Sequence, residues 1–196
     1  MHAVTPQKCQ KAIVEWIDTH KPDLFLTINF CRPCTLSRTE YLLCATHRRI
    51  LQKLLGKTWH KRKSEQPYFF AFIEQTASNN THAHLLVRRP LTDLVDSNAY
   101  CDLWKEEGGR ISHKIAQSYV TYKIAPHRLD VDVRQIWSLS GLLDYVTKKI
   151  VKGGDQFAFC VSPNVPAPLA SISCPQNISV SSTPLLIETA SRRSRF

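Results

Sequence analysis

The sequence predicts an α+β fold in which helices pack on an antiparallel sheet, and three observations lead to this prediction. The segments LFLTINF (24–30), YFFAFIE (68–74) and THAHLLV (81–87) have the apolar pattern and the β-branched or aromatic residues typical of strands. A short polar turn joins the last two, which favours an antiparallel hairpin. Helical periodicity appears between and after these strands. A chain of 196 residues suits one compact domain with a tail, or two very small domains.

The other elements follow in chain order. Ile13, Trp16 and Ile17 lie at helical spacing and predict a leading helix over 9–20. The segment 37–40 reads Ser-Arg-Thr-Glu, a capping-box pattern, which predicts a helix from there to about Leu55. The remaining predictions are a helix between Pro90 and Gly109, an ambiguous apolar run at 118–124, a strand at 129–136, a helix at 140–150 and a strand at 156–161.

Composition divides the chain into three parts. Residues 1–23 form an N-terminal helical extension, and residues 24–161 contain the strands and helices of the main domain. From residue 162 to 196 the chain is rich in Ser and Pro and has almost no charge before its last residues. Such a segment buries too little apolar surface to order itself, so we expect a mostly disordered tail.

The charge points to an anionic partner. The formal net charge is +10, and the densest basic run is KTWHKRK at 57–63. A balance of this size favours nucleic acid or a membrane surface, although a basic surface can also serve solubility alone. No apolar stretch reaches the length of a membrane span, and the N-terminus lacks the apolar core of a signal peptide. We therefore expect a cytoplasmic protein, or a nuclear one in a eukaryotic host.

The cysteines leave two interpretations open. Seven cysteines in a chain with no signal peptide favour free thiols over a disulfide framework. However, Cys31, Cys34, Cys44 and His47 follow the order C-x2-C-x9-C-x2-H, which resembles zinc-ligand spacing. The loop between the two pairs is short, so buried free thiols are the simpler interpretation.

The hairpin carries three side chains that suit a metal ion. His82 and His84 lie on one face of their strand because side chains alternate in a strand. If the hairpin folds about Ser78 in simple register, Glu74 lies directly opposite His82. Two imidazoles and a carboxylate with open positions left over are typical of a catalytic metal site. The alternative is a solvated sheet face, and a bulge would break the register.

A nucleophile for such a site is predicted in the helix SGLLDYVTKKI. Leu142, Val146 and Ile150 define its apolar stripe, and Tyr145 projects from the border of that stripe. Lys148 lies one turn further on, where its ammonium group favours an ionised phenol that attacks a phosphate. The alternative is an ordinary amphipathic helix.

Together these motifs resemble those of the HUH endonucleases, in particular the single-tyrosine rolling-circle replication initiator (Rep) proteins. That family has an FLTxx strand, a His-hydrophobe-His strand and a Tyr-x-x-Lys helix, in this order. The matching segments here are Phe25–Asn29, His82–His84 and Tyr145–Lys148, and Glu74 fits the place of a third ligand. Ala83 is smaller than the hydrophobe usual between the histidines.

The resemblance implies a ferredoxin/RRM-like antiparallel sheet and a mechanism. Glu74, His82 and His84 would hold Mg²⁺ or Mn²⁺, and Tyr145 would attack single-stranded DNA to give a 5′-phosphotyrosine link. Lys148 would neutralise the phosphate. The partner would be single-stranded DNA or an origin hairpin, and the expected DNA contacts are Thr27, Asn29, Arg88 and Lys149.

Several rival functions remain open at this stage. A single-tyrosine transposase or relaxase would use the same chemistry. A hydrolase that activates water at the metal would not need Tyr145, and a non-catalytic RRM-like nucleic-acid binder would not need the metal. Gly56-Lys57-Thr58 lacks the first glycine of a Walker A loop, so we expect a host helicase to act in trans.

Overall fold

The computed structural model describes most of the predicted domain. The described residues are 5–30, 34–75, 81–89, 99–100, 102–107, 130–152, 157–165 and 180–181. The turn at Ser78 and the ambiguous run at 118–124 lie outside them.

A six-stranded sheet forms the centre of the fold. Its strands lie in the order β4-β1-β3-β2-β5-β6. The pairs β4–β1, β1–β3, β3–β2 and β2–β5 are antiparallel, and only β5–β6 is parallel. The bounds are β1 (Leu24–Phe30), β2 (Tyr68–Gln75), β3 (Thr81–Arg88), β4 (Asp130–Gln135), β5 (Phe157–Val161) and β6 (Val180–Ser181). The predicted α+β fold is therefore confirmed, with an arrangement consistent with an RRM-like sheet.

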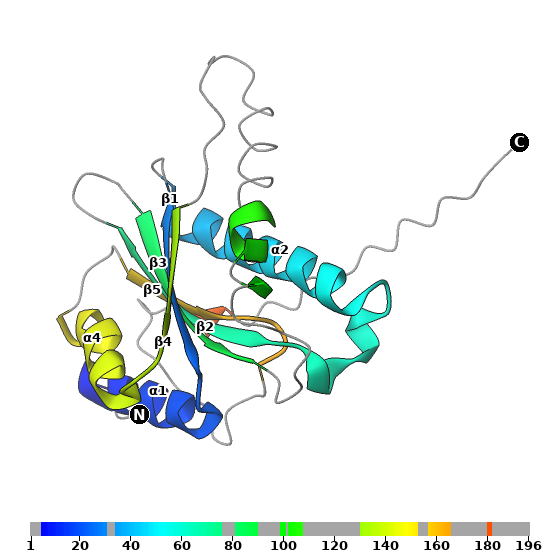
Figure 1. The fold of residues 1–196 in the computed structure, drawn as a ribbon. Helices are drawn as coiled ribbons and strands as arrows, with labels where there is room; N and C mark the ends of the chain where they lie inside the picture. The colour runs from blue at the N-terminus through cyan, green and yellow to red at the C-terminus, as the bar shows by residue number, and fades with distance from the viewer. Residues whose placement is uncertain are drawn as a thin grey trace, which may run out of the picture.

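Helices cover both faces of this sheet (Figure 1). On one face lie α1 (Pro6–His20) and α4 (Leu139–Lys152), which pack against each other. On the other face lies α2 (Leu36–Leu55), together with a helical segment at 99–100 and 102–107. Two short 3-10 turns, η1 (Trp59–Lys61) and η2 (Lys63–Glu65), connect α2 to β2.

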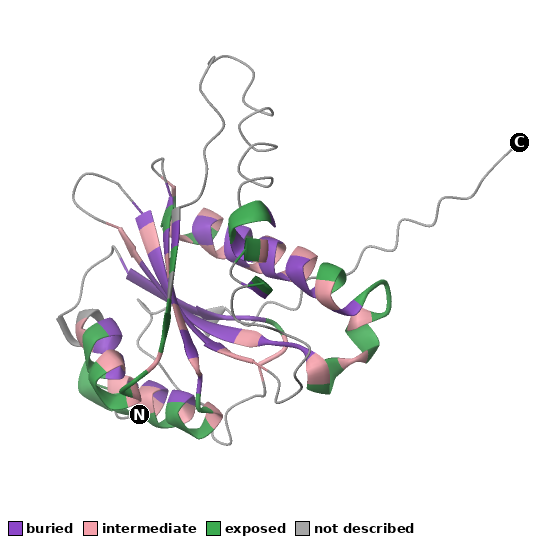
Figure 2. Ribbon diagram, viewed as in Figure 1, coloured by how far each residue is buried: buried purple, intermediate pink, exposed green. Residues whose placement is uncertain are grey.

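Strand alternation divides the apolar residues between two cores. In β2, Phe69, Ala71 and Ile73 pack in the core under α2. Phe70 and Phe72 point to the opposite face and pack with α1 and α4. Figure 2 shows the resulting band of buried residues through the sheet and along the inner sides of the helices. Because both faces of β2 are covered, this strand reads as a nearly continuous apolar run.

The predicted start of α2 needs correction. The cap of α2 is Thr35, whose side chain accepts a hydrogen bond from the Arg38 backbone N–H, so the helix starts before the predicted capping box. It ends at Gly56, as expected, where a φ of 74° suits a residue without a Cβ.

Both ends of the described chain belong to the fold. In α1, Ile13 and Ile17 are fully buried against β2 and α4, so this helix is part of the domain. After β5, Ser162 accepts a hydrogen bond from the Phe69 backbone N–H. The segment Val180–Ser181 then pairs with β5. These residues belong to the segment for which the composition predicts disorder, and its other residues after 165 lie outside the described ranges.

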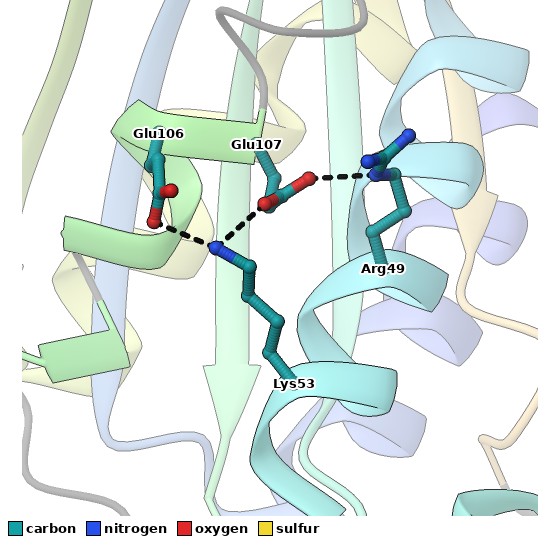
Figure 3. A network of polar contacts seen from close by, with 4 residues as sticks. All are labelled: Arg49, Lys53, Glu106 and Glu107. Carbon is teal, nitrogen blue, oxygen red and sulfur yellow. Dashed lines mark hydrogen bonds and ion pairs between the residues drawn. The ribbon is translucent and has the colours of Figure 1, made fainter. Parts of the chain in front are cut away.

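A polar network attaches the 102–107 segment to α2 (Figure 3). The Glu107 side chain is fully buried, with its carboxylate 2.6 Å from Arg49 Nε and 2.7 Å from Lys53 Nζ. Lys53 also contacts the exposed Glu106 at 2.8 Å. Burial alone would raise the pKa of Glu107, but the hydrogen bonds from Lys53 and Arg49 outweigh it and leave the pKa lowered. The buried charge is thus paired on two sides.

The cysteines only partly follow the sequence interpretation. Cys34, Cys44 and Cys160 are free thiols, whereas Cys9 is disulfide-bonded, which corrects the expectation of free thiols at that position. Of the proposed zinc ligands, Cys31 lies outside the described residues. Burial raises the pKa of Cys44 to about 11, so its thiol keeps its proton.

No helix in the described ranges has the length and apolar content needed to cross a membrane.

Candidate metal centre

The hairpin has the register on which the predicted site depends. Glu74 on β2 pairs directly with His82 on β3, and Phe72 pairs with His84. On the other side of β3, Asn29 pairs with His82 and Thr27 with His84. Because paired residues point to the same face, these side chains line one surface of the sheet, on the side of α1 and α4.

Three of these side chains form a compact group of possible ligands. One ligand atom each from Glu74, His82 and His84 lies within 4.8 Å of the others. His82 Nε2 is 3.5 Å from Glu74 Oε2, and the two imidazole rings are 5.0 Å apart. Glu74 and His82 are half-buried and His84 is buried. The group is therefore accessible to solvent at Glu74 and His82 and is enclosed by the protein at His84.

His84 is held by neighbours on β1. Thr27 Oγ1 lies 3.2 Å from His84 Nδ1, and the Phe25 ring stacks on the imidazole with centroids 5.5 Å apart. Within the described part of the chain, His84 Nε2 is buried without a hydrogen-bond partner. Burial, with His82 and Lys148 nearby, lowers the pKa of His84 to about 4 although Glu74 opposes the shift. A neutral imidazole with an unused nitrogen is the form that binds a metal.

Tyr145 lies next to this group. Its ring meets the His84 ring edge-on, with centroids 5.7 Å apart. Lys148 Nζ lies 4.1 Å from the centre of the Tyr145 ring. The sequence placed Lys148 beside Tyr145, and here the ammonium lies over the aromatic face, where a cation–π attraction holds it. Tyr145 is 49% exposed, so a large substrate can reach it.

The packing of α4 explains the position of Tyr145. Leu143, Val146 and Ile150 are buried against the sheet and α1. Thr147 is also buried, and its hydroxyl accepts a hydrogen bond of 3.0 Å from Gln10 Nε2 on α1. With this face fixed, Tyr145 emerges at the border of the buried stripe toward β3, as the helical spacing predicted.

No family model matches this chain, and neither does any curated protein or solved structure. The arguments for function therefore come from the site itself.

Of the remaining predicted DNA contacts, Asn29 lies beside the ligand group, whereas Arg88 does not. Asn29 is exposed beside His82, and Arg88 is at the other end of β3, where it donates a hydrogen bond to the Lys21 carbonyl. Lys149 belongs to α4, but its side chain lies outside the described part of the chain. The basic run 57–63 precedes β2. The first residue of that strand, Tyr68, lies about 20 Å along it from Glu74. The basic run is thus separate from the ligand group.

The arrangement fits a divalent metal ion. One carboxylate and two imidazoles are a donor set that Mg²⁺, Mn²⁺ and Zn²⁺ accept, so the ligands do not select among these ions. The grouping of three ligand atoms within 4.8 Å of one another is the observation that supports a metal most strongly. The buried His84 Nε2, which has no partner among the described residues, agrees with it because buried polar atoms normally have partners. Sequence reasoning missed the ring of Phe25 and the contact of Thr27 with His84. Both depend on which strand pairs with β3, and no local pattern reveals that.

Proposed function

We propose that this protein is a metal-dependent enzyme that cuts and rejoins single-stranded DNA through a covalent link to Tyr145, and that it initiates rolling-circle replication of a plasmid or virus. The observation that carries this proposal is the contact between Tyr145 and His84. A potential nucleophile and a potential metal ligand come from elements 61 residues apart in the chain and meet on one accessible surface.

The reaction is a transesterification. The Tyr145 hydroxyl attacks the phosphorus of a DNA phosphodiester and gives up its proton to a base in solution. The bond between phosphorus and the 3′ oxygen breaks, and that oxygen takes up a proton to become a 3′-OH. The 5′ phosphate remains attached to Tyr145. Glu74, His82 and His84 would hold a divalent ion, Mg²⁺ or Mn²⁺, and this ion would polarise the phosphate when bound.

The covalent link explains how the same site would rejoin strands. A phosphotyrosine ester conserves the energy of the phosphodiester bond, so a free 3′-OH can attack it and regenerate the tyrosine. Lys148, whose ammonium lies 4.1 Å from the centre of the Tyr145 ring, would bring positive charge near a phosphate bound to Tyr145. Half-exposure of Tyr145 suits both steps because incoming and outgoing strands need access.

Single-stranded DNA suits the surface around the site. The net charge of +10 favours a polyanion, and the surface beside the ligand group is a sheet face that includes exposed Asn29. A base-paired strand would hold its phosphates in a stiff duplex, whereas a single strand can bend across the sheet to bring one phosphate to Tyr145.

A gel assay tests the proposal. The purified chain is incubated with Mn²⁺ and a library of labelled single-stranded oligonucleotides, and we expect an adduct that survives SDS. The adduct should be absent without metal and in Tyr145→Phe. Tyr41→Phe is the matched control, because Tyr41 is 50% exposed but belongs to α2 on the opposite face of the sheet. It should form the adduct as the unaltered chain does.

The rival functions give different results in this assay. Cleavage that persists in Tyr145→Phe without an adduct would identify a hydrolase that uses water. Binding without cleavage, unaffected by His82→Ala, would identify a nucleic-acid-binding module. The role in replication is tested separately by supplying the chain in trans to a replicon that lacks its initiator, where a transposase or relaxase would fail to restore replication.

A further inference from the structure

The surroundings of His84 differ from those of the other two ligands. It is the most buried of the three, and β1 supplies both neighbours that fix its ring. Thr27 pairs with His84 in the β1–β3 register, so their side chains are directly opposed. The hydroxyl oxygen of Thr27 is 3.2 Å from Nδ1. The other ring nitrogen, Nε2, has no partner among the described residues.

This pattern of contacts decides between the two neutral forms of the imidazole. If the proton is on Nε2, a buried N–H donor has no acceptor among the described residues, which is unfavourable. If the proton is on Nδ1, it is donated to Thr27 Oγ1, and Nε2 keeps only an unused lone pair. Orphaned N–H donors are rarer in proteins than under-used acceptors. The contact with Thr27 therefore favours the form with the proton on Nδ1.

The neighbouring rings restrict the alternatives further. Phe25 stacks on one face of the imidazole at an interplanar angle of 18°, and the Tyr145 ring lies edge-on to it. A half-turn of the ring would place a carbon atom opposite Thr27 Oγ1 and lose the hydrogen bond. Stacking on Phe25 thus restricts the tilt of the imidazole plane. The hydrogen bond with Thr27 fixes which edge of the ring faces β1.

We propose that Thr27 is a positioning residue, which fixes His84 with its proton on Nδ1 and leaves the Nε2 lone pair for the metal ion. This inference rests on the metal site of the proposed function and adds to it the residue that prepares one ligand. The partner of a metal-bound histidine sets the tautomer and the ring orientation, and its loss typically reduces metal affinity by about 10–100-fold.

The first test needs no metal. In ¹⁵N spectra of the metal-free chain, the two ring nitrogens of a histidine separate according to which one carries the proton, and His84→Gln assigns the His84 signals. We expect the proton on Nδ1 of His84, and a shift of the population toward Nε2 in Thr27→Val. A proton on Nε2 in the unaltered chain, or an unchanged tautomer in Thr27→Val, would overturn the proposal.

The second test measures Mn²⁺ affinity by titration calorimetry. Thr27→Val keeps the β-branched shape and removes the hydroxyl, so we expect affinity to fall by about 10–100-fold. Thr27→Ser keeps the hydroxyl and should restore affinity to within about threefold. The control is Thr81→Val: the Thr81 hydroxyl donates to the Cys34 carbonyl at 2.7 Å, and the residue belongs to the strand of the two histidines. Its affinity should match that of the unaltered chain.

The outcomes separate the two proposals. If the unaltered chain binds no Mn²⁺, the proposed metal-dependent function fails, while the ¹⁵N spectra still decide whether Thr27 sets the tautomer. If the chain binds Mn²⁺ and Thr27→Val binds it equally well, Thr27 does not position the ligand and the metal site stands without it. Equal losses in Thr27→Val and Thr27→Ser would also contradict a role for the hydroxyl.

Discussion

His47 and His84 are two buried histidines on opposite sides of the sheet. His47 belongs to α2, which covers one face, and His84 belongs to β3 and points to the other face. His47 is 1% exposed and His84 is 5% exposed. Burial lowers the pKa of His47 to about 3, although a hydrogen bond with the Pro67 backbone opposes the shift, and it lowers the pKa of His84 to about 4. In both, Nε2 has no hydrogen-bond partner in the described ranges. By burial and ionisation alone they could not be told apart.

Their neighbours distinguish them. The ring of His47 stacks against Trp104 at 6.2 Å and meets Phe69 edge-on at 5.1 Å, so it is enclosed by aromatic rings. His84 instead joins His82 and Glu74 in the one group of three possible metal ligands found among the described residues. The neighbouring ligands, rather than burial or the unused nitrogen, therefore make His84 the candidate metal ligand of the two.

The largest expected effect separates the two histidines by metal binding. His84→Gln should weaken Mn²⁺ binding by at least about 100-fold, because a direct ligand contributes more than an outer partner. His47→Gln should leave Mn²⁺ affinity within about twofold of the unaltered chain. Titration calorimetry measures both. Similar losses in the two variants would mean that the effect comes from altered folding.

The next effect concerns the side of the sheet that α2 covers, where His47 lies. Glu107→Gln removes a charge that is paired with Arg49 and Lys53, and we expect a loss of roughly 1–3 kcal/mol in the free energy of unfolding. The value is at the lower end for a buried charge because both partners are more than a third exposed and can turn to water.

Glu106→Gln is the control for this experiment. Glu106 contacts the same lysine from an exposed position, so its loss should cost less than about 1 kcal/mol. Urea unfolding measures both variants. Equal effects in Glu106→Gln and Glu107→Gln would contradict the assignment of Glu107 as the buried anchor of the 102–107 segment.

The pH dependence of stability provides a third comparison. A histidine whose folded-state pKa lies below its ordinary value of 6.5 binds protons more readily when unfolded. Its contribution is complete above about pH 6.5 and is lost as the pH falls toward the folded pKa, which is about 3 for His47. Each such histidine adds a slope of up to about 1.4 kcal/mol per pH unit.

The pKa values of His20, His47 and His84 are all lowered, so His47→Gln should reduce the slope between pH 6 and pH 4.5, while the contributions of the other two histidines remain. Urea unfolding at several pH values gives the slope. Replacement of the exposed His60 by Gln should leave it unchanged. A slope that stays the same in His47→Gln would mean that His47 is not held neutral in the folded protein.

The smallest effect is expected at the basic run between α2 and β2. Lys57, Lys61 and Lys63 are exposed. If all three are replaced with Gln, the slope of log K for single-stranded DNA binding against log salt concentration should become less steep by about 0.7 for each phosphate that is no longer neutralised. Mn²⁺ affinity should not change, because the run lies far along β2 from Glu74. An unchanged salt dependence would show that DNA does not contact this run.

The sequence predicted much of this arrangement because the relevant signals are local. Strand alternation and a short turn were enough to place Glu74 opposite His82, and this register is confirmed. Helical spacing was enough to bring Tyr145 to the border of the buried stripe of α4. These predictions depend only on the geometry of one hairpin and one helix.

Other features depend on contacts between distant segments. The place of β1 beside β3 brings Phe25 and Thr27 to His84, and no periodicity within β1 specifies its neighbour. The pairing of Glu107 with α2 and that of Val180 with β5 likewise join segments far apart in the chain. The cap at Thr35 was missed because a second capping pattern follows it within one turn.

The central claim is that Tyr145 acts together with the group formed by Glu74, His82 and His84. Its most direct test is mass spectrometry of the protein after reaction with single-stranded DNA and Mn²⁺, nuclease treatment and proteolysis. The account predicts one nucleotide-bearing peptide, modified at Tyr145 through a 5′ phosphate and missing in His84→Gln. Modification of a different tyrosine, or cleavage of DNA without any modified peptide, would contradict it.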